Sequence, residues 1–127
     1  MKQRSLSELE QEVMNIVWQL ENCSVRDVLN KLNRTKKLAY TTVSTILQRL
    51  YGKGLVKRKV DGIAFKYFPR LSKEIYSKSM AKSFISKFID SFGDTAIVSF
   101  AESVESLPKE KRAYFLRLIK KYEHKNS

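Results

Sequence analysis

Asp61-Gly62 separates two short runs rich in β-branched and aromatic residues, Leu55 to Val60 and Ile63 to Phe68. An Asp-Gly pair between two such runs is a strong hairpin signal, because both positions of the favoured tight turn need φ > 0. Pro69 then closes the second strand. The rest of the sequence has helical periodicity, so the predicted fold class is mostly α with a small β-hairpin.

Three amphipathic segments precede this hairpin. Ser7 and Glu10 have the spacing of a capping box and begin a helix with one apolar stripe, and Ser24 and Asp27 repeat that spacing before a short second helix. A third helix is predicted from about Thr41 to about Tyr51, ending at Gly52 and Gly54. Three helices followed by a two-stranded hairpin is the element order of a winged helix-turn-helix.

The third helix has one apolar face and one face of small polar side chains, which also carries Arg49. Threonine and serine are mediocre helix formers, so such a face does little for helix stability. Their length and chemistry suit contacts with base edges and phosphates. Thr41 is in addition expected to cap the N-terminus of the helix. The polar face consists of Thr41, Thr42, Ser44, Thr45, Gln48 and Arg49.

The charge of the chain is concentrated in this region. The formal net charge is +12, and no acidic residue occurs between Asp27 and Asp61. A solvated face usually mixes both signs, so an acid-free stretch across several elements predicts a phosphate-binding surface. The stretch holds nine basic residues, namely Lys31, Arg34, Lys36, Lys37, Arg49, Lys53, Lys57, Arg58 and Lys59.

After Pro69 the sequence is helical again, and two domains are predicted: a winged-helix DNA-binding domain over 1–70 and a three-helix dimerisation domain over 71–127. The second has three aromatic-rich helical faces but is small for an independent core, so its apolar stripe is expected to pair with a second copy. The alternative is that these helices fold back over the winged domain. The residues expected to hold the dimer are Ile75, Met80, Phe84, Phe88, Ile89, Phe92, Phe100, Phe115 and Leu118.

An enzyme is not predicted. The single histidine, His124, is three residues from the end of the chain, and Cys23 has no evident catalytic or metal-binding partner. No phosphate-binding glycine motif, zinc-ligand set or other cofactor motif is present, so neither a metal nor a cofactor is expected. With one cysteine, no apolar signal-peptide core after Met1 and no membrane-spanning apolar stretch, we expect a cytoplasmic protein without membrane insertion.

Several segments resemble the penicillinase-repressor family of the BlaI/MecI/CopY type. The resemblance begins with Leu6-Ser7-Glu8-Leu9-Glu10 and Glu12 to Trp18. It continues through Leu38 to Val43, Leu47 to Leu50 and Lys53 to Val56, and through Asp61-Gly62 with Phe65 and Tyr67. Ser99 to Glu102 resembles the family's C-terminal region. The resemblance implies a dimeric winged-helix repressor that occupies palindromic operators of resistance or stress operons.

Two departures qualify what the resemblance implies. Copper-responsive members carry a C-terminal cysteine cluster, and this chain has no cysteine after Cys23, which argues against a metal sensor. In β-lactam-responsive members, the family pattern implies that a membrane-bound sensor metalloprotease cleaves an Asn–Phe bond in the dimerisation region. The matching bond here is Ser99-Phe100, which keeps the aromatic residue and lacks the asparagine.

The sequence therefore predicts a homodimeric repressor of double-stranded operator DNA. The third helix would enter the major groove, Lys36 and Lys37 would contact phosphates at its entrance, and the hairpin would touch the flanking backbone. The alternative is a winged-helix module that binds RNA or an acidic protein, which would show no preference among duplex sequences. The DNA-contacting residues are predicted to be Lys36, Lys37, Tyr40, Thr41, Thr42, Thr45, Arg49, Lys59 and Lys66.

Overall fold

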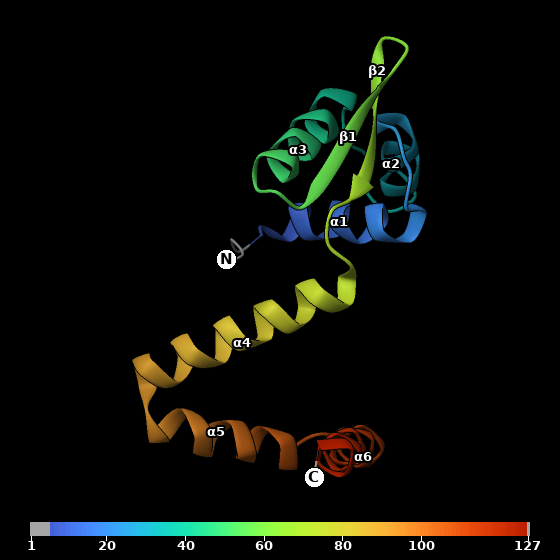
Figure 1. Ribbon diagram of the computed structural model, residues 1–127. Helices are drawn as coiled ribbons and strands as arrows, with labels where there is room; N and C mark the ends of the chain where they lie inside the picture. Colours follow the sequence, from blue (N-terminus) through green and yellow to red (C-terminus); the bar gives the residue numbers. More distant parts are fainter. Residues whose placement is uncertain (1–5, 127) are drawn as a thin grey trace. The chain divides into compact units, whose positions relative to one another are not determined.

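The computed structural model describes residues 6–126, and the N-terminal stretch for which no signal peptide is predicted lies outside them. The elements are α1 (Glu8–Leu20), α2 (Val25–Leu32), α3 (Tyr40–Gly52), β1 (Val56–Asp61), β2 (Ala64–Pro69), α4 (Lys73–Phe92), α5 (Asp94–Glu105) and α6 (Lys109–Asn126) (Figure 1). The predicted class, mostly α with a small hairpin, is confirmed. Within residues 6–126, no helix combines the length and apolar character needed to span a membrane.

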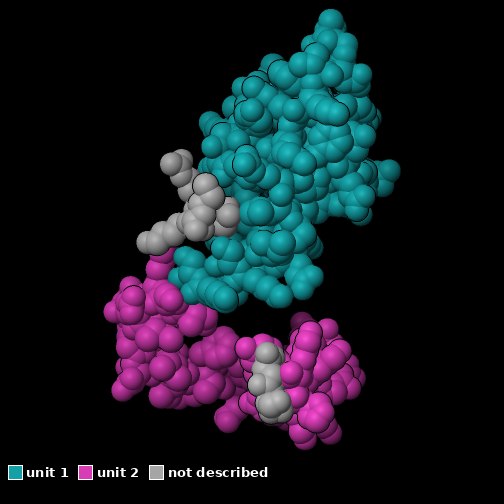
Figure 2. All heavy atoms as spheres, in the orientation of Figure 1, with its two compact units in different colours: residues 1–83 teal, residues 84–127 magenta. Residues whose placement is uncertain are grey.

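The chain forms two compact units, residues 1–83 and residues 84–127 (Figure 2). The first turns of α4 pack on the winged part of unit 1. The indole Nε1 of Trp18 donates a 2.8 Å hydrogen bond to the carbonyl of Leu71, and the rings of Trp18 and Tyr76 lie 5.4 Å apart. Tyr76 is buried, and Met80 packs against the same core. The core of unit 1 therefore extends beyond residue 70, which is the predicted end of the winged-helix domain. The predicted boundary between residues 70 and 71 stays a prediction.

Both predicted capping boxes are present. The Ser7 hydroxyl accepts from the Glu10 N–H while the Glu10 carboxylate accepts from the Ser7 N–H, and Ser24 and Asp27 exchange the same pair of bonds. These bonds satisfy donors that the first turn of a helix otherwise leaves unpaired. They fix where α1 and α2 begin, and the apolar stripe of each helix faces the core.

Helix α3 begins one residue before its predicted start and ends, as predicted, at a glycine in the left-handed conformation, Gly54. Its N-cap is Ala39, and no side chain caps it, so the expected capping role of Thr41 is wrong. The reason is that the helix starts at Tyr40, which places Thr41 inside the first turn. At the other end, the Leu55 N–H bonds to the Leu50 carbonyl and the Gly54 N–H to the Tyr51 carbonyl. This Schellman ending requires the positive φ of Gly54, +78°.

Strands β1 and β2 are antiparallel, and their register pairs Asp61 with Ala64. The two turn positions are therefore Gly62 and Ile63, and of the pair Asp61-Gly62 only Gly62 has a positive φ, +66°. The prediction of φ > 0 at both Asp61 and Gly62 is wrong, because one glycine at the first turn position satisfies a type II′ turn. Cys23 adds a two-bond bridge to Tyr67 of β2 and so attaches the hairpin to the end of α1.

Unit 2 consists of the second half of α4 together with α5 and α6, and Ala96 is the one buried residue among its described side chains. Aromatic rings run along one side of α4, with Phe84 and Phe88 5.5 Å apart and Phe88 and Phe92 5.2 Å apart. Many large apolar side chains are exposed in the single chain, among them Phe84, Ile85, Ile89, Phe92, Ile97, Phe100, Leu118 and Ile119.

Candidate nucleic-acid interface

Helix α3 presents its polar face to solvent. Its apolar residues, including Val43 and Leu47, are buried on the inner side. On the outer side the structure exposes Tyr40, Thr41, Thr42, Thr45, Gln48 and Arg49, which we call the α3 face. A hollow of about 330 Å³ adjoins this face, between the start of α1 and the middle of α3. The predicted DNA-contacting residues of α3 are thus brought together on one accessible surface.

The predicted phosphate contacts in the connector differ from each other. The Nζ of Lys36 lies 2.9 Å from a carboxylate oxygen of Glu12, and this hydrogen bond raises the pKa of Lys36 above its usual value. Lys37 is exposed, and no ion pair or hydrogen bond joins its side chain to any residue that the structure describes. The same holds for Arg49. Lys37 and Arg49 are therefore two cations near the α3 face that have no partner among the described residues.

The hairpin places its predicted lysines on the side away from α3. Successive strand residues point to opposite faces, and the guanidinium of Arg58 lies over the ring of Tyr51 in α3. Lys59 and its cross-strand partner Lys66 therefore belong to the outer face. Lys66 in addition lies 3.8 Å from a carboxylate oxygen of Asp27. The predicted hairpin lysines are accessible, but the structure does not group them with the α3 face.

Two arginines that are absent from the predicted set of DNA-contacting residues lie beside α3. The Cζ of Arg26 is 5.1 Å from the centroid of the Tyr40 ring, and the Cζ of Arg58 is 3.9 Å from that of Tyr51. Arg58 also lies 4.4 Å from the ring centroid of Phe65. Arg58 belongs to the acid-free stretch, but its position against α3 depends on strand register, which composition does not reveal.

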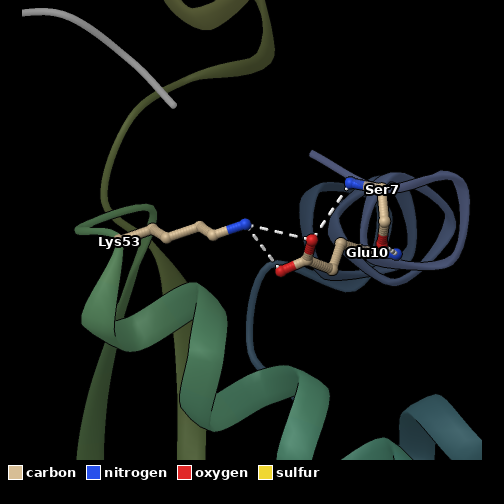
Figure 3. Close-up of polar contacts among 3 residues, drawn as sticks. All are labelled: Ser7, Glu10 and Lys53. Carbon is tan, nitrogen blue, oxygen red and sulfur yellow. Dashed lines mark hydrogen bonds and ion pairs between the residues drawn. The ribbon is translucent and has the colours of Figure 1, made fainter. Parts of the chain in front are cut away.

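A partly buried ion pair joins the start of α1 to the end of α3 (Figure 3). The Nζ of Lys53 donates to both carboxylate oxygens of Glu10, at 3.0 and 2.9 Å, and Glu10 is 5% exposed. The hydrogen bond from Lys53, followed by that from the Ser7 N–H, lowers the pKa of Glu10 from 4.5 to about 2. The pair holds α1 against α3 and neutralises a carboxylate that lines the hollow beside the α3 face.

The described residues do not form a reaction centre. Cys23 is buried, and burial raises the pKa of its thiol to about 11, so it is not a thiolate nucleophile. No three His, Cys, Asp or Glu residues gather as a metal site within residues 6–126. The arrangement is that of a binding surface: a helix with exposed hydroxyl, amide and guanidinium groups, flanked by cations.

The bond between Ser99 and Phe100 lies inside α5, in unit 2. Phe100 is 51% exposed and its ring lies 6.2 Å from that of Phe115 in α6. The Ser99 carbonyl accepts a 2.8 Å hydrogen bond from the hydroxyl of Ser103. Of the predicted dimerisation residues, Ile75, Phe84, Ile89, Phe92, Phe100 and Leu118 are exposed, and Phe88 and Phe115 are half-buried. Met80 is also half-buried, but it packs against the core of unit 1.

Comparison with known proteins gives one consistent family. The model of the penicillinase repressor family matches residues 6–121. The penicillinase repressor of Bacillus licheniformis is 26% identical over 121 residues, which cover 95% of this chain and 92% of that protein. The transcriptional regulator BlaI of Mycobacterium tuberculosis is 36% identical over 101 residues, covering 78% of this chain and 73% of that one.

A similar solved structure is the solution structure of the DNA-binding domain of the repressor BlaI. It is 30% identical, covers 57% of this chain and 90% of the domain, and superposes with a TM-score of 0.51. The winged helix-turn-helix predicted from element order is confirmed by this likeness and by the observed order of helices and strands.

The ion pair predicts a specific acid response. Because the folded pKa of Glu10 is about 2 and its ordinary value is 4.5, its stabilisation is complete above pH 4.5 and is lost as the pH falls toward 2. Glu10→Gln keeps a capping oxygen and removes the charge, so we expect a loss of about 1–3 kcal/mol at pH 7 and a shallower decline below pH 4.5. Urea unfolding followed by Trp18 fluorescence measures both.

The matched control is Glu8→Gln, which removes an exposed carboxylate from the same helical turn. This variant should follow the wild-type acid decline. Equal losses of stability between pH 7 and pH 3 in the wild type and Glu10→Gln would show that the ion pair does not stabilise the fold.

Proposed function

This chain belongs to the penicillinase repressor family, and from that membership we propose that it represses transcription as a homodimer on a palindromic operator. The observation that carries the proposal is the exposed α3 face. There Arg49, which has no partner among residues 6–126, lies beside three threonines on a helix whose other face is buried. Side chains of this length and hydrogen-bonding capacity read base edges in the major groove.

We assign the contacts as follows. Helix α3 lies in the major groove with Thr42, Thr45 and Arg49 toward the bases. Lys37 binds a phosphate at the entrance of the helix, because its side chain has no competing partner among the described residues. The charge of Lys36 is already partly balanced by Glu12, so we expect Lys36 to contribute less to phosphate binding. The regulated operon is one for a β-lactamase or another antibiotic-resistance function, as the names of the relatives suggest.

The apolar surface of unit 2 supports the homodimer. A unit of 44 residues in which the described side chains include one buried residue has too little core to be stable in isolation. Its parts of α4 and α6 expose phenylalanine, isoleucine and leucine side chains. Unit 2 also contains an apolar hollow that can accommodate an apolar side chain of a partner. The hollow is lined by Phe84, Ile85, Phe88, Ile89, Ala96, Ile97 and Phe100. A second copy of the same unit supplies such a partner and forms a twofold interface.

Release is proposed to follow cleavage at Ser99-Phe100 by a membrane-bound sensor metalloprotease. The bond lies in the middle of a helix of 12 residues, so a protease reaches it only when α5 opens locally. Gly93, with φ of +63°, precedes α5 and is a point at which such opening can begin. Cleavage would separate Phe100 and α6, with Phe115 and Leu118, from the rest of the interface. The remaining apolar surface is too small to hold a dimer.

Substitutions in the α3 face and in the connector should separate specificity from affinity. Arg49→Ala or Thr45→Ala should weaken binding to a selected site by about 1–3 kcal/mol more than binding to a random duplex. Lys37→Ala should weaken both equally and lower the salt slope by about one for each bound subunit. Fluorescence anisotropy with both duplexes at several salt concentrations gives these values. A uniform loss for Arg49→Ala would contradict its base-reading role.

The fragment of residues 1–99 represents the N-terminal product of cleavage and retains all of unit 1. We expect it to sediment as a monomer and to bind a two-half-site duplex at least about 100-fold more weakly than the full chain, because the second half-site is no longer tethered. Its affinity for a single half-site should stay close to that of the full chain. A dimeric fragment, or one that keeps full affinity for the two-half-site duplex, would refute this account of release.

A further inference from the structure

Two tyrosines on α3 each make a cation–π contact with an arginine of a neighbouring element. Tyr40 begins the helix and contacts Arg26 of α2, and Tyr51 near the end of the helix contacts Arg58 of β1. A separation of 11 residues is about three helical turns, so both rings lie on nearly the same side of α3, about 16 Å apart along its axis. Each of the two tyrosines is 42% exposed.

Arg58 is the more firmly held of the two. Its guanidinium lies over the faces of Tyr51 and Phe65, at 3.9 and 4.4 Å from the ring centroids, and the side chain is half-buried. The described residues provide no hydrogen-bond acceptor and no carboxylate for its N–H groups. The two rings therefore contact the guanidinium, while its N–H donors have no acceptor among the described residues.

Arg26 lies at the opposite end of α3, where it is exposed and contacts a single ring, that of Tyr40. Its neighbour in sequence, Asp27, accepts hydrogen bonds from the Ser24 N–H and lies 3.8 Å from Lys66, so this carboxylate has other partners. No ion pair joins Arg26 to a carboxylate within the described part of the chain. A free guanidinium stacked on an exposed tyrosine thus flanks the α3 face at each end.

We propose that Arg26 and Arg58 bind two phosphates along one edge of the groove that α3 occupies, with Tyr40, Tyr51 and Phe65 holding the guanidinium planes. A guanidinium presents paired donors that match phosphate oxygens, and stacking on a ring leaves those donors free. Because the rings already restrict the side chains, less conformational entropy is lost on binding. The assignment rests on the proposed function, since it takes α3 as the element that enters DNA.

The hairpin contains a basic residue, Lys57, that can be compared directly with Arg58. Lys57 precedes Arg58 in β1 and points to the outer face, opposite the side on which Arg58 meets α3. It is exposed and has no partner among the described residues. Lys57 and Arg58 carry the same charge one residue apart, so a difference between their effects reports on position and not on net charge.

The test uses the full chain and two 30-base-pair duplexes, one selected from random sequence by the wild type and one random. Binding is measured by anisotropy across a range of salt concentrations. We expect Arg58→Met and Arg26→Met each to weaken binding to both duplexes by the same factor. Each should reduce the slope of log affinity against log salt by about one for each bound subunit, and the double variant by about two.

Lys57→Met is the matched control and should leave the slope unchanged. Thermal unfolding followed by Trp18 fluorescence checks that each variant is folded, and Arg26→Met tests the proposal independently if Arg58→Met perturbs the hairpin. An unchanged slope for both arginine variants, or an equal change for Lys57→Met, would overturn the assignment. If the wild type enriches no sequence from the random pool, the proposed function fails and not merely this assignment.

Discussion

Burial of one face of α3 is the interaction on which the rest of unit 1 depends. Val43, Leu47 and Leu50 are completely buried and Ile46 is 5% exposed, packed among α1, α2 and β1. This packing places the opposite face of the same helix in solvent with a fixed orientation. A helix that had to be stabilised by its polar side chains would not have them free to bind DNA. The core therefore supplies the stability that the threonine-rich face does not.

Electrostatic contacts refine this arrangement around α3. The Glu10–Lys53 pair joins the start of α1 to the residue that follows α3, and the Lys36–Glu12 pair attaches the connector to α1. Both pairs use basic residues of the acid-free stretch for structure. Fewer basic residues beside α3 are therefore available to bind phosphate than the acid-free stretch suggests. The available positive charge is carried mainly by Lys37, Arg49, Arg26 and Arg58.

Local patterns predict the elements of this fold, and contacts between elements account for what the sequence leaves open. Apolar periodicity and capping boxes correctly predict the helices of unit 1, and Asp61-Gly62 correctly predicts a hairpin. The centre of the turn is displaced by one residue because cross-strand register, and not the dipeptide, determines it. The positions of Arg26 and Arg58 follow from how α2 and β1 pack on α3. No spacing in the sequence predicts the positions of these two arginines. The resemblance to a repressor family, in contrast, predicts a DNA-binding surface on the third helix.

The central claim is that the α3 face reads DNA sequence in a twofold-symmetric complex. Selection of binding sites from a pool of random duplexes by the full-length protein tests it most directly. The account predicts enrichment of one palindrome whose half-sites are separated, centre to centre, by about 10 base pairs or a multiple of that spacing. A pool that is retained by the protein at low salt with no sequence enriched over the input would contradict the account. It would favour a basic module that binds polyanions without reading bases.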